Sequence, residues 1–97
     1  MKVVVQRVLE AQVNIDGEKF SAIKEGLLIL LGIGYKDNKK DVEYLINKIN
    51  KIRIFSDGKN NFNYSINDLN KEILVVSQFT LYGDITKENR PNFSKAA

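Results

Sequence analysis

Three polar residues at the end of an apolar run could take part in chemistry. Residues 72–84 read EILVVSQFTLYGD, and the β-branched run at 73–76 predicts a strand buried on both faces. The segment that follows consists of Ser77, Gln78, Phe79 and Thr80. Polar groups at the end of a buried strand cost free energy unless they are hydrogen-bonded. Two interpretations remain open: a polar bulge whose hydroxyls bind the backbone, or an active-site corner beside exposed backbone N–H groups.

The amino-acid composition excludes several kinds of catalytic site. The chain has no histidine and no cysteine, so a Ser-His-Asp triad, a Cys-His pair, a disulfide and a histidine-based zinc site are all excluded. Only oxygen ligands could hold a metal, and the acidic residues are spread rather than clustered. We therefore expect no metal and no cofactor. In a hydrolytic reaction, protons would have to move through hydroxyls, carboxylates, water or the substrate.

The overall composition is that of an ordinary globular protein. With 97 residues, 43% of them apolar and 28% charged, we expect one domain over residues 1–97. No apolar run approaches the ~18 residues of a membrane span, and no signal-peptide pattern opens the chain. Together with the absence of cysteine, this favours a cytoplasmic protein. The net charge of +3 is compatible with an RNA partner, but equally basic proteins exist without one.

The remaining pattern predicts strands around one helix. Strands are expected at 2–8, 11–15, 18–23 and 27–33, with a hairpin turn at Asp16-Gly17, and further short strands at 53–55 and 62–66. Gly32 and Gly34 lie two residues apart, but no phosphate-loop pattern follows them.

A helix is expected from an N-cap at Asp37 to Ile52. One apolar stripe runs along it, formed by Val42, Leu45, Ile46, Ile49 and Ile52. Its lysines are better explained as a solvated face than as a nucleic-acid patch. After Asp84 the chain becomes polar, which predicts a surface loop that carries Lys87 and Arg90 close to the corner.

Five segments resemble the D-aminoacyl-tRNA deacylase (D-Tyr-tRNA deacylase) family in the same order. The run SQFTLYGD resembles the family's SQFTL-x-x-D signature, and the others are MKVVVQRV, GLLILLGI, INKIRIF and RPNFSKAA. The resemblance thus covers nearly the whole chain. Family members continue further and carry a Gly-Pro motif near the C-terminus, whereas the single proline here is Pro91 in another context. We therefore expect a fragment or a shortened member of the family.

The resemblance implies a fold, a reaction and a set of site residues. The implied fold is α/β of the α+β type: a mixed β-barrel-like sheet with a packed helix, homodimeric when complete. The implied reaction is hydrolysis of the ester of D-aminoacyl-tRNA, assisted by the ribose 2′-hydroxyl, with the tRNA acceptor end as partner. The implied site residues are Ser77, Gln78, Phe79 and Thr80 for catalysis and Arg7 for substrate binding. Lys87 and Arg90 are further candidates for substrate binding, because they are basic and lie close to the corner in the sequence. The alternative is a non-enzymatic tRNA-binding or dimerisation module, that is, a truncated and inactive member of the family.

Overall fold

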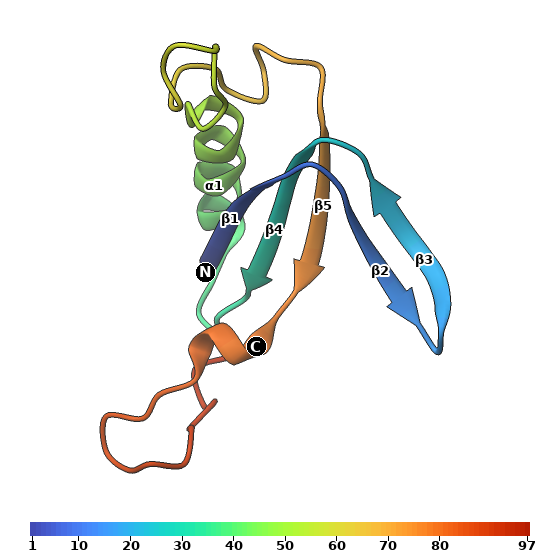
Figure 1. Ribbon diagram of the computed structural model, residues 1–97. Helices are drawn as coiled ribbons and strands as arrows, with labels where there is room; N and C mark the ends of the chain where they lie inside the picture. Colours follow the sequence, from blue (N-terminus) through green and yellow to red (C-terminus); the bar gives the residue numbers. More distant parts are fainter.

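A computed structural model describes residues 1–97 and contains five strands, one α-helix and one short 3₁₀ helix. The strands are β1 (Lys2–Val8), β2 (Ala11–Ile15), β3 (Glu18–Ile23), β4 (Gly26–Gly32) and β5 (Glu72–Ser77); the helices are α1 (Lys39–Lys51) and η1 (Phe79–Tyr82). Figure 1 shows α1 beside the strands and η1 below their ends. The predicted mixed α+β class is confirmed.

The strands form a mixed sheet and a separate hairpin. In the three-stranded sheet the order is β1-β4-β5, with β4 antiparallel to β1 and parallel to β5. The β2-β3 hairpin projects beside β5 (Figure 1). Its turn at Asp16 and Gly17 has positive φ at both residues, 52° and 80°, which is the geometry of the tight hairpin turns. The sheet is open in this chain, with β1 and β5 at its edges.

The helix begins one residue later than its sequence pattern predicted. Asn38 is the N-cap: its side chain accepts from the Lys40 and Asp41 N–H groups, and the Asp41 carboxylate accepts from the Asn38 N–H. The prediction that Asp37 caps the helix was therefore wrong. The reason is the acid three residues after Asn38, which completes a reciprocal capping box that Asp37 could not form.

The core lies between α1 and the β1–β4 part of the sheet. Leu27, Ile29, Phe55 and Ile66 form its buried cluster, and Ile49 of α1 packs against it. The prediction that the last strand is buried on both faces was wrong, because only Leu74 of β5 is buried. Ile73 and Val75 share a face with Leu27 and Ile29 but remain exposed, since β5 is an edge strand that the core cluster does not cover.

The connection between α1 and β5 is held by a loop network rather than by strands. The strands expected at 53–55 and 62–66 are absent, and a single bridge joins Phe55 to Tyr64. The carboxylate of Asp57 accepts from the Asn60 N–H and then the Lys59 N–H, and these hydrogen bonds lower the pKa of Asp57. Polar side chains that bind nearby backbone thus replace the expected strand pairing.

Candidate functional site

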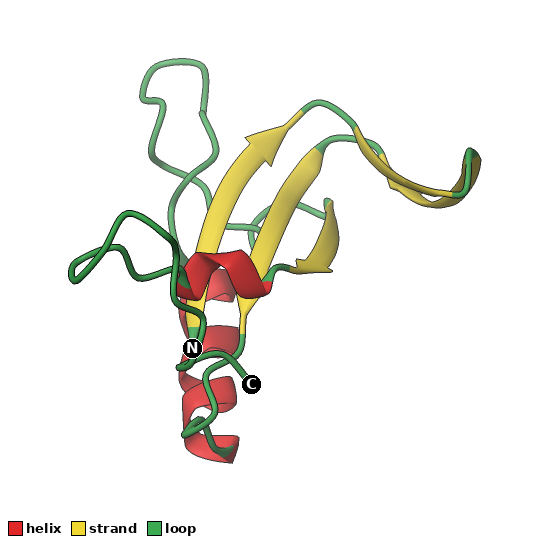
Figure 2. Cartoon of the chain, turned by 90° about the horizontal axis from the view of Figure 1, so that it is seen from below, coloured by secondary structure: helices red, strands yellow, loops and turns green.

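The corner, defined as residues 77–80, is the junction between β5 and η1. β5 ends at Ser77, and the chain turns directly into η1 instead of forming a bulge, which was one of the two interpretations of the sequence. The Gln78 N–H donates to the Leu31 carbonyl at 2.7 Å, so it extends the pairing of β5 with β4 by one bond. The Gly83 N–H then donates to the Thr80 carbonyl at 3.0 Å and closes the turn. Figure 2 shows η1 lying across the ends of the sheet strands.

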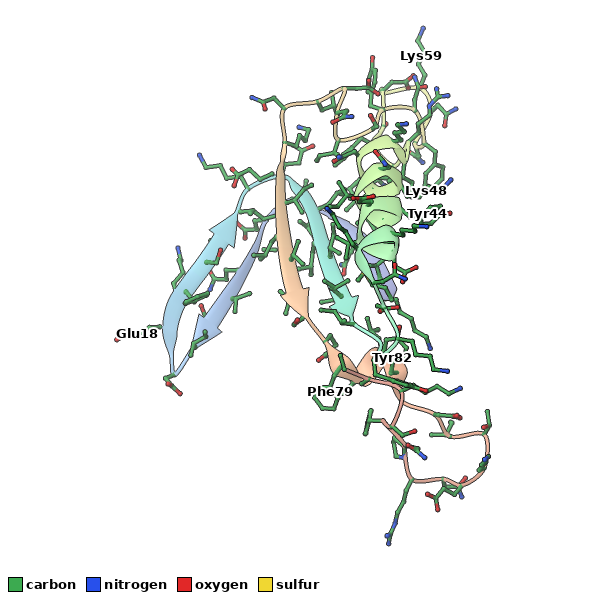
Figure 3. All side chains as sticks on the ribbon, turned by 180° about the vertical axis from the view of Figure 1, so that it is seen from behind. Glu18, Tyr44, Lys48, Lys59, Phe79 and Tyr82 are labelled. Atoms are coloured by element: carbon green, nitrogen blue, oxygen red, sulfur yellow. The ribbon has the colours of Figure 1, made fainter.

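Two glycines, Gly32 at the end of β4 and Gly34 in the β4–α1 connection, let η1 lie close to the sheet. A Cβ at Gly32 would lie 3.1 Å from the Leu81 Cβ, and one at Gly34 only 2.7 Å from the Tyr82 hydroxyl oxygen. The spacing of these glycines therefore serves close packing rather than phosphate binding. The Lys2 ammonium lies 4.8 Å from the centre of the Tyr82 ring. Figure 3 shows Phe79 and Tyr82 together at this end of the molecule.

Asp37 connects the same region to the first residue of the chain. Its carboxylate accepts from the Gly34 N–H at 2.6 Å and forms an ion pair with the Met1 ammonium at 2.6 Å. The hydrogen bond from the Met1 ammonium, followed by that from Gly34, lowers the pKa of Asp37. Loss of solvent contact, followed by the charges of Asp37 and Asp41, raises the pKa of Tyr82.

The polar side chains of the corner have no partners in the protein. Those of Ser77, Gln78 and Thr80 are exposed, and none of them takes part in any side-chain hydrogen bond of the structure. The structure therefore does not have the hydroxyl-to-backbone bonds of a purely structural bulge. In a 3₁₀ helix the first N–H groups, here of Phe79 and Thr80, have no partner within the helix. The Gln78 side chain does not cap them.

Arg7 lies towards the other end of the sheet. Its guanidinium Nη1 donates to the carbonyl oxygens of Ile54 at 3.0 Å and Asn61 at 3.2 Å. In the register Arg7 is level with Ile73, four residues before Ser77 along β5. At the usual rise of a strand, four residues correspond to about 13 Å. The structure therefore does not bring Arg7 to the corner within one chain. A hollow of about 470 Å³ opens beside it instead.

Lys87 and Arg90 lie in a loop beyond η1. An antiparallel bridge between Asp84 and Asn92 closes this loop, which extends away from the sheet (Figure 1). Both cations are exposed, and neither forms an ion pair. Hydrogen bonds from the Thr86 N–H and hydroxyl, followed by the charges of Lys95 and Lys87, lower the pKa of Asp84. The loop is thus fixed at its base, while its two cations remain free.

Sequence reasoning missed the residues that position the corner. Lys2, Gly34 and Tyr82 come from separate segments and were not assigned to a site, and Asp37 was taken only as a helix cap. The closely spaced glycines at 32 and 34 were the one available signal, because glycine marks places where another segment must approach closely. No three acidic side chains lie close enough together to hold a metal ion, and neither α1 nor η1 has the length and apolar character of a membrane-spanning helix.

Comparison with known proteins gives a consistent family. The D-aminoacyl-tRNA deacylases of Finegoldia magna and Thermosipho africanus are 55% and 50% identical to this chain over all 97 residues. The chain spans 66% and 65% of their lengths. The solved structure of a protein named c-Myc DNA Unwinding Element Binding Protein superposes with a TM-score of 0.91 at 44% identity, covering 99% of this chain and 64% of that one. The sequence profile described as D-Tyr-tRNA(Tyr) deacylase matches residues 4–97, and the chain therefore belongs to that family.

Proposed function

We propose that the corner hydrolyses the ester bond of D-aminoacyl-tRNA, releasing a D-amino acid and free tRNA. One observation carries the proposal. The side chains of Ser77, Gln78 and Thr80 are exposed and unpartnered on a backbone that the Gln78–Leu31 hydrogen bond holds in place. Exposed polar groups on a fixed backbone are what a binding or catalytic site needs. The D-aminoacyl-tRNA deacylases among the relatives supply the reaction.

The chemistry we propose is carried by backbone donors and by the substrate. Water attacks the ester carbonyl, the carbonyl oxygen becomes negative, and the bond to the terminal ribose oxygen then breaks as that oxygen takes up a proton. The N–H groups of Phe79 and Thr80 would stabilise the negative oxygen, and each such donor is worth about 3 kcal/mol. The neighbouring ribose 2′-hydroxyl would assist proton transfer. No histidine is present to act as a general base for Thr80.

Substrate binding is proposed to come from the cations around the corner. Lys87 and Arg90 are exposed and free of ion pairs, so they are suited to phosphates of the acceptor end. Arg7 is held by Ile54 and Asn61 towards the far end of the sheet, so it would approach a corner only if that corner belonged to a second chain. A cytoplasmic homodimer is accordingly part of the proposal.

Exposed apolar side chains support the association of two chains. Val75 is 54% exposed on the edge strand, Phe20 is 73% exposed on the hairpin, and Phe79 is 57% exposed at the corner. Large exposed apolar groups of this kind commonly mark protein interfaces. Sedimentation equilibrium would test the dimer, and a monomer at all protein concentrations would argue against it.

The second candidate function is binding of nucleic acid or dimerisation without catalysis. The observation in its favour is the name of the similar solved protein, which describes that protein as binding a DNA unwinding element. A chain of this kind would bind tRNA but leave the ester intact.

The experiment that separates the two functions is a deacylation assay with D- and L-aminoacyl-tRNA. Under the enzymatic proposal the chain releases the D-amino acid, and Thr80→Ala keeps most of this activity because the backbone donors remain. Tight tRNA binding with no release of either amino acid would support the second candidate instead. An acyl group trapped on Thr80 would contradict the mechanism while leaving the reaction in place.

A further inference from the structure

The exposed face of α1 carries a basic stripe formed by Lys40, Tyr44, Lys48 and Lys51. At 3.6 residues per turn, these positions lie on one side of the helix. All four residues are exposed, and Tyr44 is 64% exposed between the lysines. Figure 3 shows Tyr44 and Lys48 on the side of α1 that faces away from the strands. The opposite side carries Ile49, which packs against the core.

The lysines of the basic stripe have no charged partner in the structure. The two ion pairs of the chain are Met1–Asp37 and Lys71–Glu25, and neither involves α1. The acid nearest to Lys40 in the sequence, Asp41, accepts the Asn38 N–H in the capping box. Lys48 and Lys51 are favourable in the last helical turn because of the helix dipole, but Lys40 in the first turn is not. Helix stability therefore does not explain Lys40, and the proposal below departs from the solvated face that the sequence alone favoured for these lysines.

The basic stripe begins near η1, the short helix that follows the corner. The segment that leads into α1 lines a hollow together with Tyr82 of η1, and Lys36 and Lys95 line the same hollow. From there α1 runs for 13 residues, or about 20 Å, away from η1 (Figure 1). Cations thus continue from this hollow beside η1 along the length of the helix.

We propose that the basic stripe binds the phosphate backbone of a base-paired RNA stem whose single-stranded 3′ end reaches the corner. This inference rests on the proposed function, which places an aminoacylated RNA end at the corner. Lysines repeating along a helix are suited to a row of phosphates, and the Tyr44 hydroxyl is suited to a sugar or phosphate oxygen. RNA is favoured over an acidic protein because the stripe lacks the cluster of buried apolar anchors that protein interfaces need.

The test compares two variants with the same charge change. Lys40→Glu/Lys48→Glu alters the basic stripe. Lys19→Glu/Lys24→Glu, the control, alters one lysine in β3 and one just after it, both exposed and without ion pairs. The probes are an RNA hairpin with a single-stranded 3′ end and that end alone, each titrated across a salt series. The stripe variant should lose about tenfold or more in affinity for the hairpin, and its salt slope should fall by about 1.5. Its affinity for the single-stranded end should not change.

The control variant should stay within about twofold of the unchanged protein for both probes. Equal losses in the two variants would mean that only net charge matters, and this would overturn the proposal. An unchanged affinity of the stripe variant for the hairpin would overturn it as well. Thermal unfolding of both variants verifies that each is folded.

A small ester substrate distinguishes failure of the inference from failure of the proposed function. Hydrolysis of a D-aminoacyl-adenosine needs the corner but not the stem, so the stripe variant should hydrolyse it at the rate of the unchanged protein. If the unchanged protein hydrolyses no ester but the stripe variant alone loses hairpin binding, the function fails and the stem-binding surface stands. If esters are hydrolysed and the stripe variant binds the hairpin normally, only the inference fails.

Discussion

The two ends of the β4–β5 pair differ in how their polar groups are used. At the end beside Arg7, the guanidinium is bound to two carbonyl oxygens, and Gly26 lies against the backbone of Glu72. At the corner, the backbone is equally well held by the Gln78–Leu31 bond, but the side chains of Ser77 and Thr80 bind nothing in the protein. At one end the polar side chain is hydrogen-bonded within the protein, and at the other end the polar side chains have no hydrogen-bond partner in the protein.

This difference separates a structural role from a site. A polar side chain that binds backbone contributes to the stability of the fold, and its loss leaves those carbonyl groups without a partner. A polar side chain with no internal partner contributes little to stability and remains available to a ligand. Substitutions at the two ends should therefore have opposite effects on stability and activity.

The largest effect on stability is expected from Gly26→Ala. A Cβ at this position would lie 1.8 Å from the Glu72 carbonyl oxygen, and because that atom belongs to the backbone of β5 the strands must separate. We expect a loss of about 3 kcal/mol or more in the free energy of unfolding, measured by urea denaturation. The control is Gly17→Ala, where nothing lies within 4 Å but φ is 80°, so a loss of about 1 kcal/mol is expected. Equal losses would show that the strands tolerate a side chain here.

Gly34→Ala should cause the next largest loss of stability, and a second substitution should recover part of it. The nearest atom to a Cβ here is the Tyr82 hydroxyl oxygen at 2.7 Å, the far end of a side chain. We expect a loss of about 1–3 kcal/mol in unfolding free energy. Tyr82→Phe removes the clashing oxygen and should restore part of this loss in a double-mutant cycle. Strictly additive effects would mean that Gly34 and Tyr82 do not constrain each other.

Arg7→Ala and Thr80→Ala test the comparison of the two ends directly. Arg7→Ala removes the hydrogen bonds to Ile54 and Asn61 and should lower the unfolding free energy by about 1–2 kcal/mol. Thr80→Ala removes an exposed hydroxyl with no partner, so its effect should stay within about 0.5 kcal/mol. Urea denaturation of both variants provides the measurement. A larger loss of unfolding free energy for Thr80→Ala would contradict the view that the corner side chains do not stabilise the fold.

The smallest expected effect is a change in how the unfolding free energy depends on pH at acidic pH, caused by substitution of Asp37. The pKa of Asp37 is lowered from 3.8 in the folded chain, so its ion pair with Met1 contributes stability above pH 3.8 that is lost as the pH falls through the folded pKa. Asp37→Asn should lower stability at neutral pH and reduce its dependence on pH below 3.8. Unfolding curves over a pH series would show this. An unchanged acid profile would assign the dependence to Asp57, Asp68 and Asp84, whose pKa values are lowered as well.

The corner also shows why backbone roles are hard to predict. One interpretation of the sequence was an active-site corner in which Ser77, Gln78 and Thr80 lie beside exposed backbone N–H groups. In the structure the Gln78 N–H is consumed by Leu31, a residue 47 positions earlier in the chain. Only the pairing of β4 with β5 decides this, and no pattern within residues 72–84 contains it.

The sequence by itself determined the features that depend on neighbouring residues. Alternating and β-branched runs predicted β1 to β5, the Asp16-Gly17 pair predicted the hairpin, and the apolar stripe predicted α1. These follow from local backbone preferences and from side-chain periodicity, which act over a few residues. The family was also evident in the sequence, because its motifs are contiguous in the chain.

The tertiary structure alone decided which of these residues are exposed and which are buried or hydrogen-bonded within the chain. Val75 is exposed because β5 is an edge strand. Arg7 donates hydrogen bonds to the carbonyl oxygens of Ile54 and Asn61, and the missing side chain of Gly34 leaves room for Tyr82. Each of these outcomes joins segments that are far apart in the sequence. Hydrogen bonding and burial at such positions depend on which distant segment of the chain packs there, and these contacts form only when the chain folds.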